Sequence, residues 1–259
     1  MSITIQSMAS DQLRMQQLNA QLSTGNRINS AADDAAGAAI IEEMQAQING
    51  FNQGTANVAD MQNLVRTAEG GLDSVSDSLQ RARELSLQAS NGTLSSSNRE
   101  IIQGEINQIM QSIEGTVRNT EFNNQRILDG SFSDMNTAAN PDGSGIAVTI
   151  PAMSVAALGL DNFDVTGNFD ISAVDAAIET VNSARAELGA VSNRFDSTMN
   201  SNDISALNLA AARSRIADTD VAREYSEREQ IRLMQEFQTM MLNQETQDMR
   251  ARQDMFMRF

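Results

Sequence analysis

The chain has 259 residues, a formal net charge of -16 at pH 7, and no His, Cys or Trp. All 18 basic residues are Arg, because the sequence contains no Lys. These absences exclude disulfides, thiolate and imidazole metal ligands, lysine Schiff bases and the commonest general base, so we expect no enzyme and no cofactor. The negative charge disfavours nucleic acid and anionic membranes, and the polar spacing of the helices below predicts no membrane insertion.

Residues 1–23 form the first predicted helix. Met8, Met15 and Leu22 recur in it at a spacing of seven, which indicates one apolar face. The opening MSITIQSMAS has neither a basic run nor an apolar core, so we expect no cleavable secretory signal and a different export route.

Residues 24–37, TGNRINSAADDAAG, interrupt this periodicity with a glycine and then place two carboxylates side by side. Asp33 and Asp34 have two interpretations. The pair suggests either a metal or acid–base site, or carboxylates that favour the N-terminus of the next helix through its dipole. The sequence favours the helix terminus.

Residues 40–87 carry an unbroken seven-residue repeat, which is typical of a coiled-coil seam. The positions between the repeats are polar, so a helix of roughly 70 Å must bury its single stripe against a partner helix. Gly70 and Gly71 inside it predict a close contact or a bend. The seam residues are Met44, Phe51, Val58, Val65, Leu72 and Leu79.

A turn at residues 89–96 precedes the next predicted helix, and Ser97 with Glu100 fits a capping box at its start. Apolar residues follow at intervals of three and four, so we expect this helix to fold back antiparallel on the rod. They are Ile102, Ile106, Ile109, Ile113 and Val117.

Residues 119–168 differ in character, because they hold both prolines and the alternating run Ile146, Val148, Ile150. The alternation predicts one or two small β-hairpins. A segment of this length is too short for another globular domain, so we expect a β-turn region at about residues 120–170.

From Ser172 the seven-residue repeat returns, which supplies a partner for the first rod in antiparallel or parallel orientation. Residues 200–203 interrupt it, and after Asp220 a last helix is predicted to run to the C-terminus. The expected fold class is mainly α, with long antiparallel helical rods in a coiled-coil-like bundle and a small β-hairpin region in the middle. The second seam is Val174, Val181, Leu188 and Phe195.

Four ordered segments resemble bacterial flagellin, the subunit of the flagellar filament, over about residues 22–231. EFNNQRILDG and LGLDNF in the middle of the chain strengthen the resemblance. The four segments are RINSAADDAAG (27–37), QRARELSLQASNGT (80–93), LGAVSNRF (188–195) and ARSRIADTD (212–220).

This resemblance implies a structural subunit that polymerises into the filament used for swimming, in a short form without variable outer domains. It implies that residues 1–36 and 217–259 pair as an inner-tube core domain and that residues 37–216 form an outer-tube rod domain. It further implies type III export to an extracellular filament. The implied partners are copies of the chain, an export chaperone, and the cap and junction proteins.

Within the implied inner tube, methionines recur at both ends of the chain. Met is flexible and packs adaptably, so one hypothesis is that a Met-lined seam tolerates slightly different subunit packings; the alternative is ordinary apolar filling. The candidates for subunit packing are Met8, Met15, Leu22, Arg27, Ile28, Ile231, Met234, Phe237, Met241, Leu242, Met249 and Phe256.

Arg81, Leu85 and Glu105 match positions at which many flagellins are bound by the vertebrate Toll-like receptor for flagellin. The resemblance therefore implies a receptor-recognition surface. The alternative is a solvated charge pair at a subunit interface, which is worth little by itself.

Two other functional classes remain open. One is the filament-to-hook junction protein, which shares terminal helices with flagellin; the segments QRARELSLQ and ARSRIADTD favour flagellin. The other is a secreted helical interaction protein or an enzyme, whose chemistry would have to rely on carboxylates alone.

Overall fold

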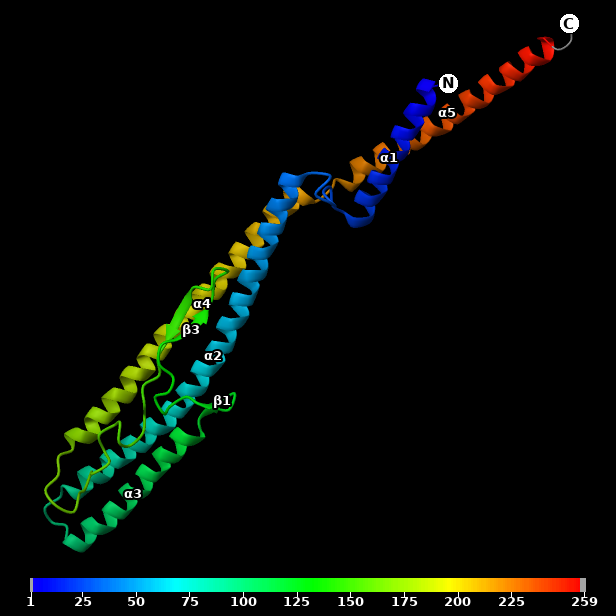
Figure 1. Cartoon of the computed structure of the whole chain (residues 1–259). Coiled ribbons are helices and arrows are strands. Elements are labelled where there is room, and N and C mark those ends of the chain that lie inside the picture. Colours follow the sequence, from blue (N-terminus) through cyan, green and yellow to red (C-terminus); the bar gives the residue numbers. More distant parts are fainter. Residues whose placement is uncertain (1, 257–259) are drawn as a thin grey trace. The chain divides into compact units, whose positions relative to one another are not determined.

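A computed structural model describes the backbone of residues 2–256 and the side chains of residues 7–255. Five helices and two β-hairpins occur within this part of the chain, which confirms the predicted fold class (Figure 1). The chain divides into two compact units, residues 1–48 with 207–259 and residues 49–206. The elements are α1 (Ser2–Thr24), α2 (Ala35–Ala89), α3 (Ser96–Asn119), β1 (Glu121–Phe122), β2 (Gln125–Arg126), β3 (Met135–Ala138), β4 (Gly145–Val148), α4 (Ser172–Ala217) and α5 (Val221–Phe256).

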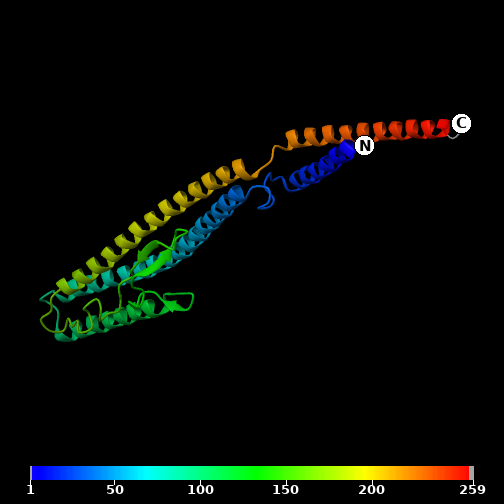
Figure 2. The same cartoon turned by 45° about the horizontal axis from the view of Figure 1, so that its top comes forward.

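In the unit of residues 49–206, α2 and α4 run side by side in opposite directions (Figures 1 and 2). Three polar pairs fix their register, because each step back along α2 is matched by an equal step forward along α4. The pairs are Arg83 with Asp175 (2.5 Å), Asp73 with Arg185 (2.8 Å) and Gln62 with Asp196 (2.7 Å). These pairs confirm the antiparallel orientation of the expected fold class, although the seam spacing alone allowed both orientations.

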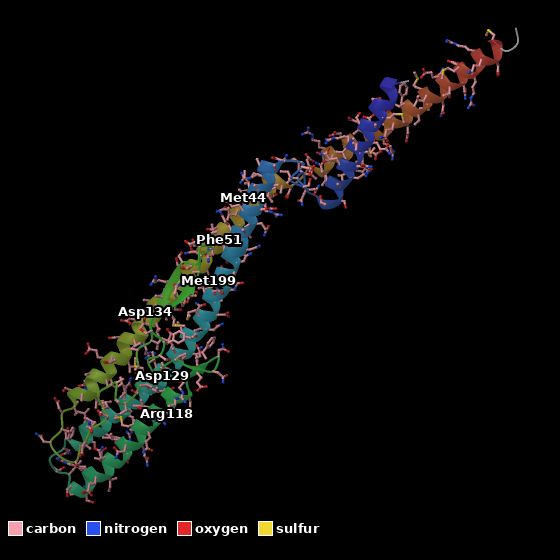
Figure 3. All side chains as sticks on the ribbon, viewed as in Figure 1. Met44, Phe51, Arg118, Asp129, Asp134 and Met199 are labelled. Atoms are coloured by element: carbon pink, nitrogen blue, oxygen red, sulfur yellow. The ribbon has the colours of Figure 1, made fainter. Side chains whose placement is uncertain are left out.

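The core of this unit lies between α2, α3, α4 and the connecting segment of residues 127–160. Burial of the apolar stripes supplies most of its stabilisation, at about 25 cal/mol per Å² of apolar surface. Val58 and Leu79 on α2 are fully buried, as is Phe195 on α4. Met199 of α4, labelled in Figure 3, packs partly buried against the same cluster.

The α3 helix begins two residues earlier than the capping box at Ser97 predicted. Ser95 is the N-cap: its backbone is extended and its side chain accepts a hydrogen bond from the backbone N–H of Asn98 at 3.2 Å. The run SSS offered several equivalent caps, and the local pattern could not distinguish them. Ile102, Ile106, Ile113 and Val117 of α3 are buried against the other elements.

The β3–β4 hairpin packs on α2 at two glycines. A Cβ on Gly50 would lie 2.6 Å from Cβ of Pro141, and a Cβ on Gly54 would lie 2.0 Å from the carbonyl oxygen of Ala139. The side-chain amide of Asn57 also donates to the Ala138 carbonyl at 2.9 Å. The close approach of the hairpin therefore requires glycine at these positions of the helix.

Residues 200–203 interrupt the seven-residue repeat but not the helix, since α4 is continuous from Ser172 to Ala217. Asn202 is buried at 3% exposure, and its amide donates to the carbonyl of Ala139 at 2.8 Å. This polar residue therefore breaks the hydrophobic pattern without breaking the helix, because its hydrogen bond offsets the cost of burial.

The glycine pair in the middle of α2 has one close contact. A Cβ on Gly71 would meet Leu128 and Thr120 at 2.8 Å, whereas a Cβ on Gly70 would meet no atom of the described residues within 4 Å. The close packing predicted for the pair therefore belongs to Gly71.

Candidate functional site

In the unit of residues 1–48 and 207–259, the connections between the helices lie against each other. Asn26 and Asp218 form an isolated antiparallel bridge. The backbone N–H of Arg27 donates to the carbonyl of Ala217 at 2.6 Å, and that of Thr219 donates to the carbonyl of Gly25 at 3.0 Å. Two of the four segments that carry the family resemblance, 27–37 and 212–220, thus meet in space.

Aspartate carboxylates cap the N-termini of α2 and α5, the two helices that begin shortly after this bridge. Asp34 accepts from the backbone N–H of Gly37 at 2.9 Å, and Asp220 accepts from that of Ala222 at 3.1 Å, so each caps the helix that follows it. Asp33 instead accepts from the backbone of Asn29 and Ser30, and these hydrogen bonds hold its pKa below the usual 3.8.

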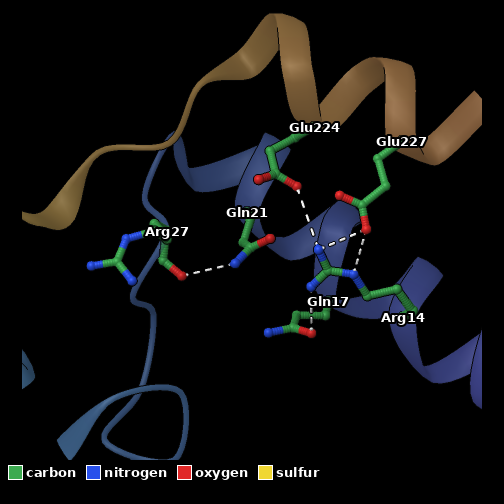
Figure 4. A network of polar contacts seen from close by, with 6 residues as sticks. All are labelled: Arg14, Gln17, Gln21, Arg27, Glu224 and Glu227. Atoms are coloured by element: carbon green, nitrogen blue, oxygen red, sulfur yellow. Dashed lines mark hydrogen bonds and ion pairs between the residues drawn. The ribbon is translucent and has the colours of Figure 1, made fainter.

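A polar network joins α1 to α5 (Figure 4). The guanidinium of Arg14 donates to Glu227 at 2.8 Å and lies 4.0 Å from Glu224. Arg14 also donates to Gln17 at 3.0 Å. Gln21, buried at 5% exposure, donates to the carbonyl of Arg27 at 2.8 Å and so ties α1 to the connection that follows it. This network orients the two helices against each other.

Helix α5 leaves large apolar side chains exposed along much of its length. Phe237 is 56% exposed and Met240 is 63% exposed, although burial of either would be favourable. The exposed apolar face of α5 is defined here by Leu233, Met234, Phe237, Met240, Met241, Met249 and Met255.

The predicted subunit-packing residues divide into four groups. Arg27, Met234, Phe237, Met241 and Met249 are exposed; Ile28 is buried; and the side chain of Phe256 lies outside the described residues. The remaining five are half-buried, and two of them, Met8 and Met15, line a groove of about 400 Å³ between α1 and α5. The half-buried five are Met8, Met15, Leu22, Ile231 and Leu242.

The predicted rod-seam residues lie inside the helix bundle. Met44 and Phe51, labelled in Figure 3, are half-buried. All the others are fully or almost fully buried, and they are Val58, Val65, Leu72, Leu79, Val174, Val181, Leu188 and Phe195. From Val58 onward, the seam residues are therefore buried by other residues of the same chain.

The predicted receptor residues are only partly brought together. Arg81 and Glu105 face each other across a groove of about 630 Å³ between α2 and α3, at 3.9 Å, and Arg81 also pairs with Glu84 at 2.9 Å. Leu85 is 2% exposed and packs in a cluster with Ile102. Its side chain therefore supports this surface from beneath and does not lie on it.

The sequence interpretation missed the residues that connect elements distant in the chain. Arg14 and Asn202 have no local signature, since their partners Glu227 and Ala139 lie 213 and 63 residues away. The spacing of Gly50 and Gly54 in GFNQG was a usable signal, because small residues four apart on one helix face let another backbone approach closely.

Among the described residues, no group of three or more acidic, His or Cys side chains is placed to hold a metal ion. No described helix has both the length and the apolar character that crossing a membrane requires. The fold, with its paired helices and its exposed apolar face on α5, defines a helical subunit of a protein assembly.

Two family profiles match the chain, "Bacterial flagellin N-terminal helical region" over residues 1–133 and "Bacterial flagellin C-terminal helical region" over residues 171–250. The chain therefore belongs to the bacterial flagellin family. The profiles extend beyond residues 22–231, which the sequence motifs cover.

Curated relatives match this chain over most of their length. A flagellin of Halalkalibacterium halodurans is 38% identical over 239 residues, covering 89% of this chain and 85% of the relative. A flagellin of Bacillus subtilis is 37% identical over 263 residues, with 86% of each chain covered. The flagellar filament 33 kDa core protein of Treponema phagedenis is 35% identical over 257 residues, covering 91% of this chain and 90% of the relative.

Solved structures share the fold. The crystal structure of Bacillus cereus flagellin has a TM-score of 0.50 at 27% identity and covers 61% of this chain and 94% of its own. A putative flagellar hook-associated protein from Vibrio parahaemolyticus has a TM-score of 0.59 at 17% identity, covering 72% and 100%, which shows the fold alone. The chain is a structural subunit of the flagellar filament, a short form of flagellin.

Proposed function

We propose that this subunit polymerises through its terminal helices, with residues 1–36 and 217–259 forming the inner tube of the filament and residues 37–216 the outer tube. The exposed apolar face of α5 is the observation that carries the proposal. Covering one such half-exposed side chain contributes about 1 kcal/mol, and each subunit offers several. Contacts that repeat from copy to copy without closing into a ring produce a helical polymer.

The polar network between α1 and α5 holds the two helices together, and so orients the exposed apolar face of α5 for contact with a neighbouring copy. Arg14 joins the two helices through Glu227, and Gln238 of α5 donates to Asp11 of α1 at 3.0 Å. The half-buried Met8 and Met15 flank the same helix pair. We expect α5 beyond the reach of α1 to become more ordered when neighbouring copies cover it.

Methionine suits such a surface because its thioether side chain adapts to different contacts. The Met-lined seam is proposed to let the tube accept slightly different subunit packings. Replacing Met234, Met241 and Met249 by Leu tests this idea, and unchanged filament curvature and stability would reject it.

The family resemblance supports export of the chain through the flagellar type III apparatus, with growth of the extracellular filament at its distal end. It also supports transient binding to an export chaperone and contacts with the cap and junction proteins. In a strain with an in-frame deletion in the export apparatus, the chain should stay inside the cell. Secretion of the chain by such a strain would contradict this route.

The groove between α2 and α3 is the proposed receptor-recognition surface. Arg81 is 58% exposed in its side chain and Glu105 is 53% exposed, so both are available to a partner, while Leu85 shapes the groove from beneath. Arg81→Ala should lower the signal in a reporter assay for the vertebrate Toll-like receptor for flagellin. Equal signals from both forms would reject the assignment.

Seeded polymerisation followed by electron microscopy tests the proposed function. Phe237→Glu adds a charge to the exposed apolar face of α5 and should prevent filament growth, because a carboxylate resists burial. Asn243→Glu adds the same charge to the same helix on a face that also carries Glu236 and Arg250, so it should leave growth intact.

The outcome separates the two members of the superfamily. Long uniform filaments that Phe237→Glu alone abolishes support the filament subunit. Parent protein that only caps existing ends would instead identify the junction protein, and equal growth of both variants would show that α5 makes no subunit contact through this face.

A further inference from the structure

The methionines of the chain differ sharply in accessibility. Met153 lies in the core with 0% exposure, whereas five methionines of α5 are 44–64% exposed. These five, the α5 methionines, are Met234, Met240, Met241, Met249 and Met255. Since the sequence contains no Cys and no Trp, the exposed thioethers are its most readily oxidised groups.

Hydrogen peroxide converts a thioether to a sulfoxide in one two-electron step. The sulfur lone pair attacks one peroxide oxygen, and the S–O bond forms as the O–O bond breaks. The departing hydroxide takes up the remaining proton and leaves as water, so sulfur is oxidised and peroxide is reduced by two electrons each. Access of the oxidant to sulfur sets the rate, which favours the α5 methionines over Met153.

We propose that the α5 methionines are a modification site for peroxide, and that their oxidation keeps the free subunit out of the filament. The inference rests on the proposed function, in which a neighbouring copy covers this face. A sulfoxide is polar, and burying it among apolar side chains without a hydrogen-bond donor is unfavourable. Methionine sulfoxide reductases reverse the modification, so the site acts as a reversible control on assembly.

Oxidation of the α5 methionines acts on the subunit before it joins the filament and not afterwards. In the free subunit Met240 is 63% exposed, whereas neighbours in a filament would cover it. Oxidant should therefore block growth of new filament while existing filament stays intact.

The test compares free and assembled protein under one dose of hydrogen peroxide, with mass-spectrometric mapping of each methionine. In the free subunit, the α5 methionines should oxidise about tenfold faster than Met153, and in filaments they should be protected by a similar factor. Equal oxidation of α5 in both states would overturn the proposal without depending on any variant.

Seeded growth then measures the consequence. Oxidised subunit should need about tenfold more protein to elongate seeds, and treatment with the reductases should restore growth. A variant with Leu at the five α5 positions should elongate seeds to the same extent before and after peroxide, because it has no α5 thioether to oxidise, whereas Met135→Leu, a control at a 43% exposed methionine of β3, should lose growth on oxidation as the parent does. Undiminished growth of the oxidised parent would refute the inference. Failure of the untreated parent to grow would instead refute the proposed function.

Discussion

The glycines of α2 differ in what surrounds them, and substitution of Gly70 and Gly54 should separate their roles. Gly70→Ala adds a methyl group that meets no atom of the described residues and should stabilise the helix by about 0.5–1 kcal/mol. Gly54→Ala should destabilise the protein, because its Cβ would lie 2.0 Å from the backbone carbonyl of Ala139 and would push the β3–β4 hairpin away. Thermal unfolding followed by circular dichroism measures both; a loss of stability in Gly70→Ala would contradict this account.

Single residues show where sequence interpretation succeeds and fails. The assignment of Asp34 to a helix N-terminus agrees with its hydrogen bond to the Gly37 backbone, because capping depends on residues close in the sequence. The role of Asn202 could not be predicted, since the carbonyl that accepts its hydrogen bond belongs to Ala139, 63 residues away. Buried polar residues whose partners are distant cannot be interpreted from the local pattern.

At the scale of helices, the buried seam holds the α2–α4 pair together far more than the polar pairs along its edges. Leu72→Ala removes a fully buried side chain and should cost about 2–5 kcal/mol of unfolding free energy. Asp73→Ala removes the exposed ion pair with Arg185 and should cost at most about 1 kcal/mol. Denaturant unfolding of the two adjacent variants compares these values, and equal losses would contradict the dominance of the seam.

The helices themselves were predictable because a seven-residue repeat is a local pattern. The repeat alone allows either orientation of the two rods, and the antiparallel register depends on contacts such as Arg83 with Asp175, which lie 92 residues apart. The hairpins were predicted from alternation at Ile146 and Val148, yet their docking on α2 depends on Gly50 and Gly54. The candidate site could also be predicted only in part from the sequence. The apolar residues of α5 could be identified, but the polar network at Arg14 could not.

At the scale of the whole molecule, charge varies little with pH across the neutral and mildly alkaline range. The sequence has no His, Lys or Cys, and Arg stays protonated throughout. At acid pH five aspartates matter, because hydrogen bonds from their own turns lower their pKa below 3.8. They are Asp33, Asp129, Asp142, Asp164 and Asp170.

A carboxyl whose pKa is lower in the folded than in the unfolded state contributes stability above the unfolded pKa and loses it as the pH falls through the folded pKa. We therefore expect a level melting temperature from about pH 6 to about pH 9 and a steep fall below about pH 4. Asn at the five positions should reduce that fall, since it removes the titrating groups. Circular dichroism melts across this range measure it; an equally steep fall in the Asn variant would contradict the assignment.

The terminal helices are proposed to build the inner tube of the filament, where the exposed apolar face of α5 is buried between subunits. Helical reconstruction of the assembled filament by cryo-electron microscopy tests it most directly. We predict α1 and α5 in the innermost layer, with Phe237 and Met241 packed against neighbouring copies. Filaments in which these side chains face solvent would contradict the account.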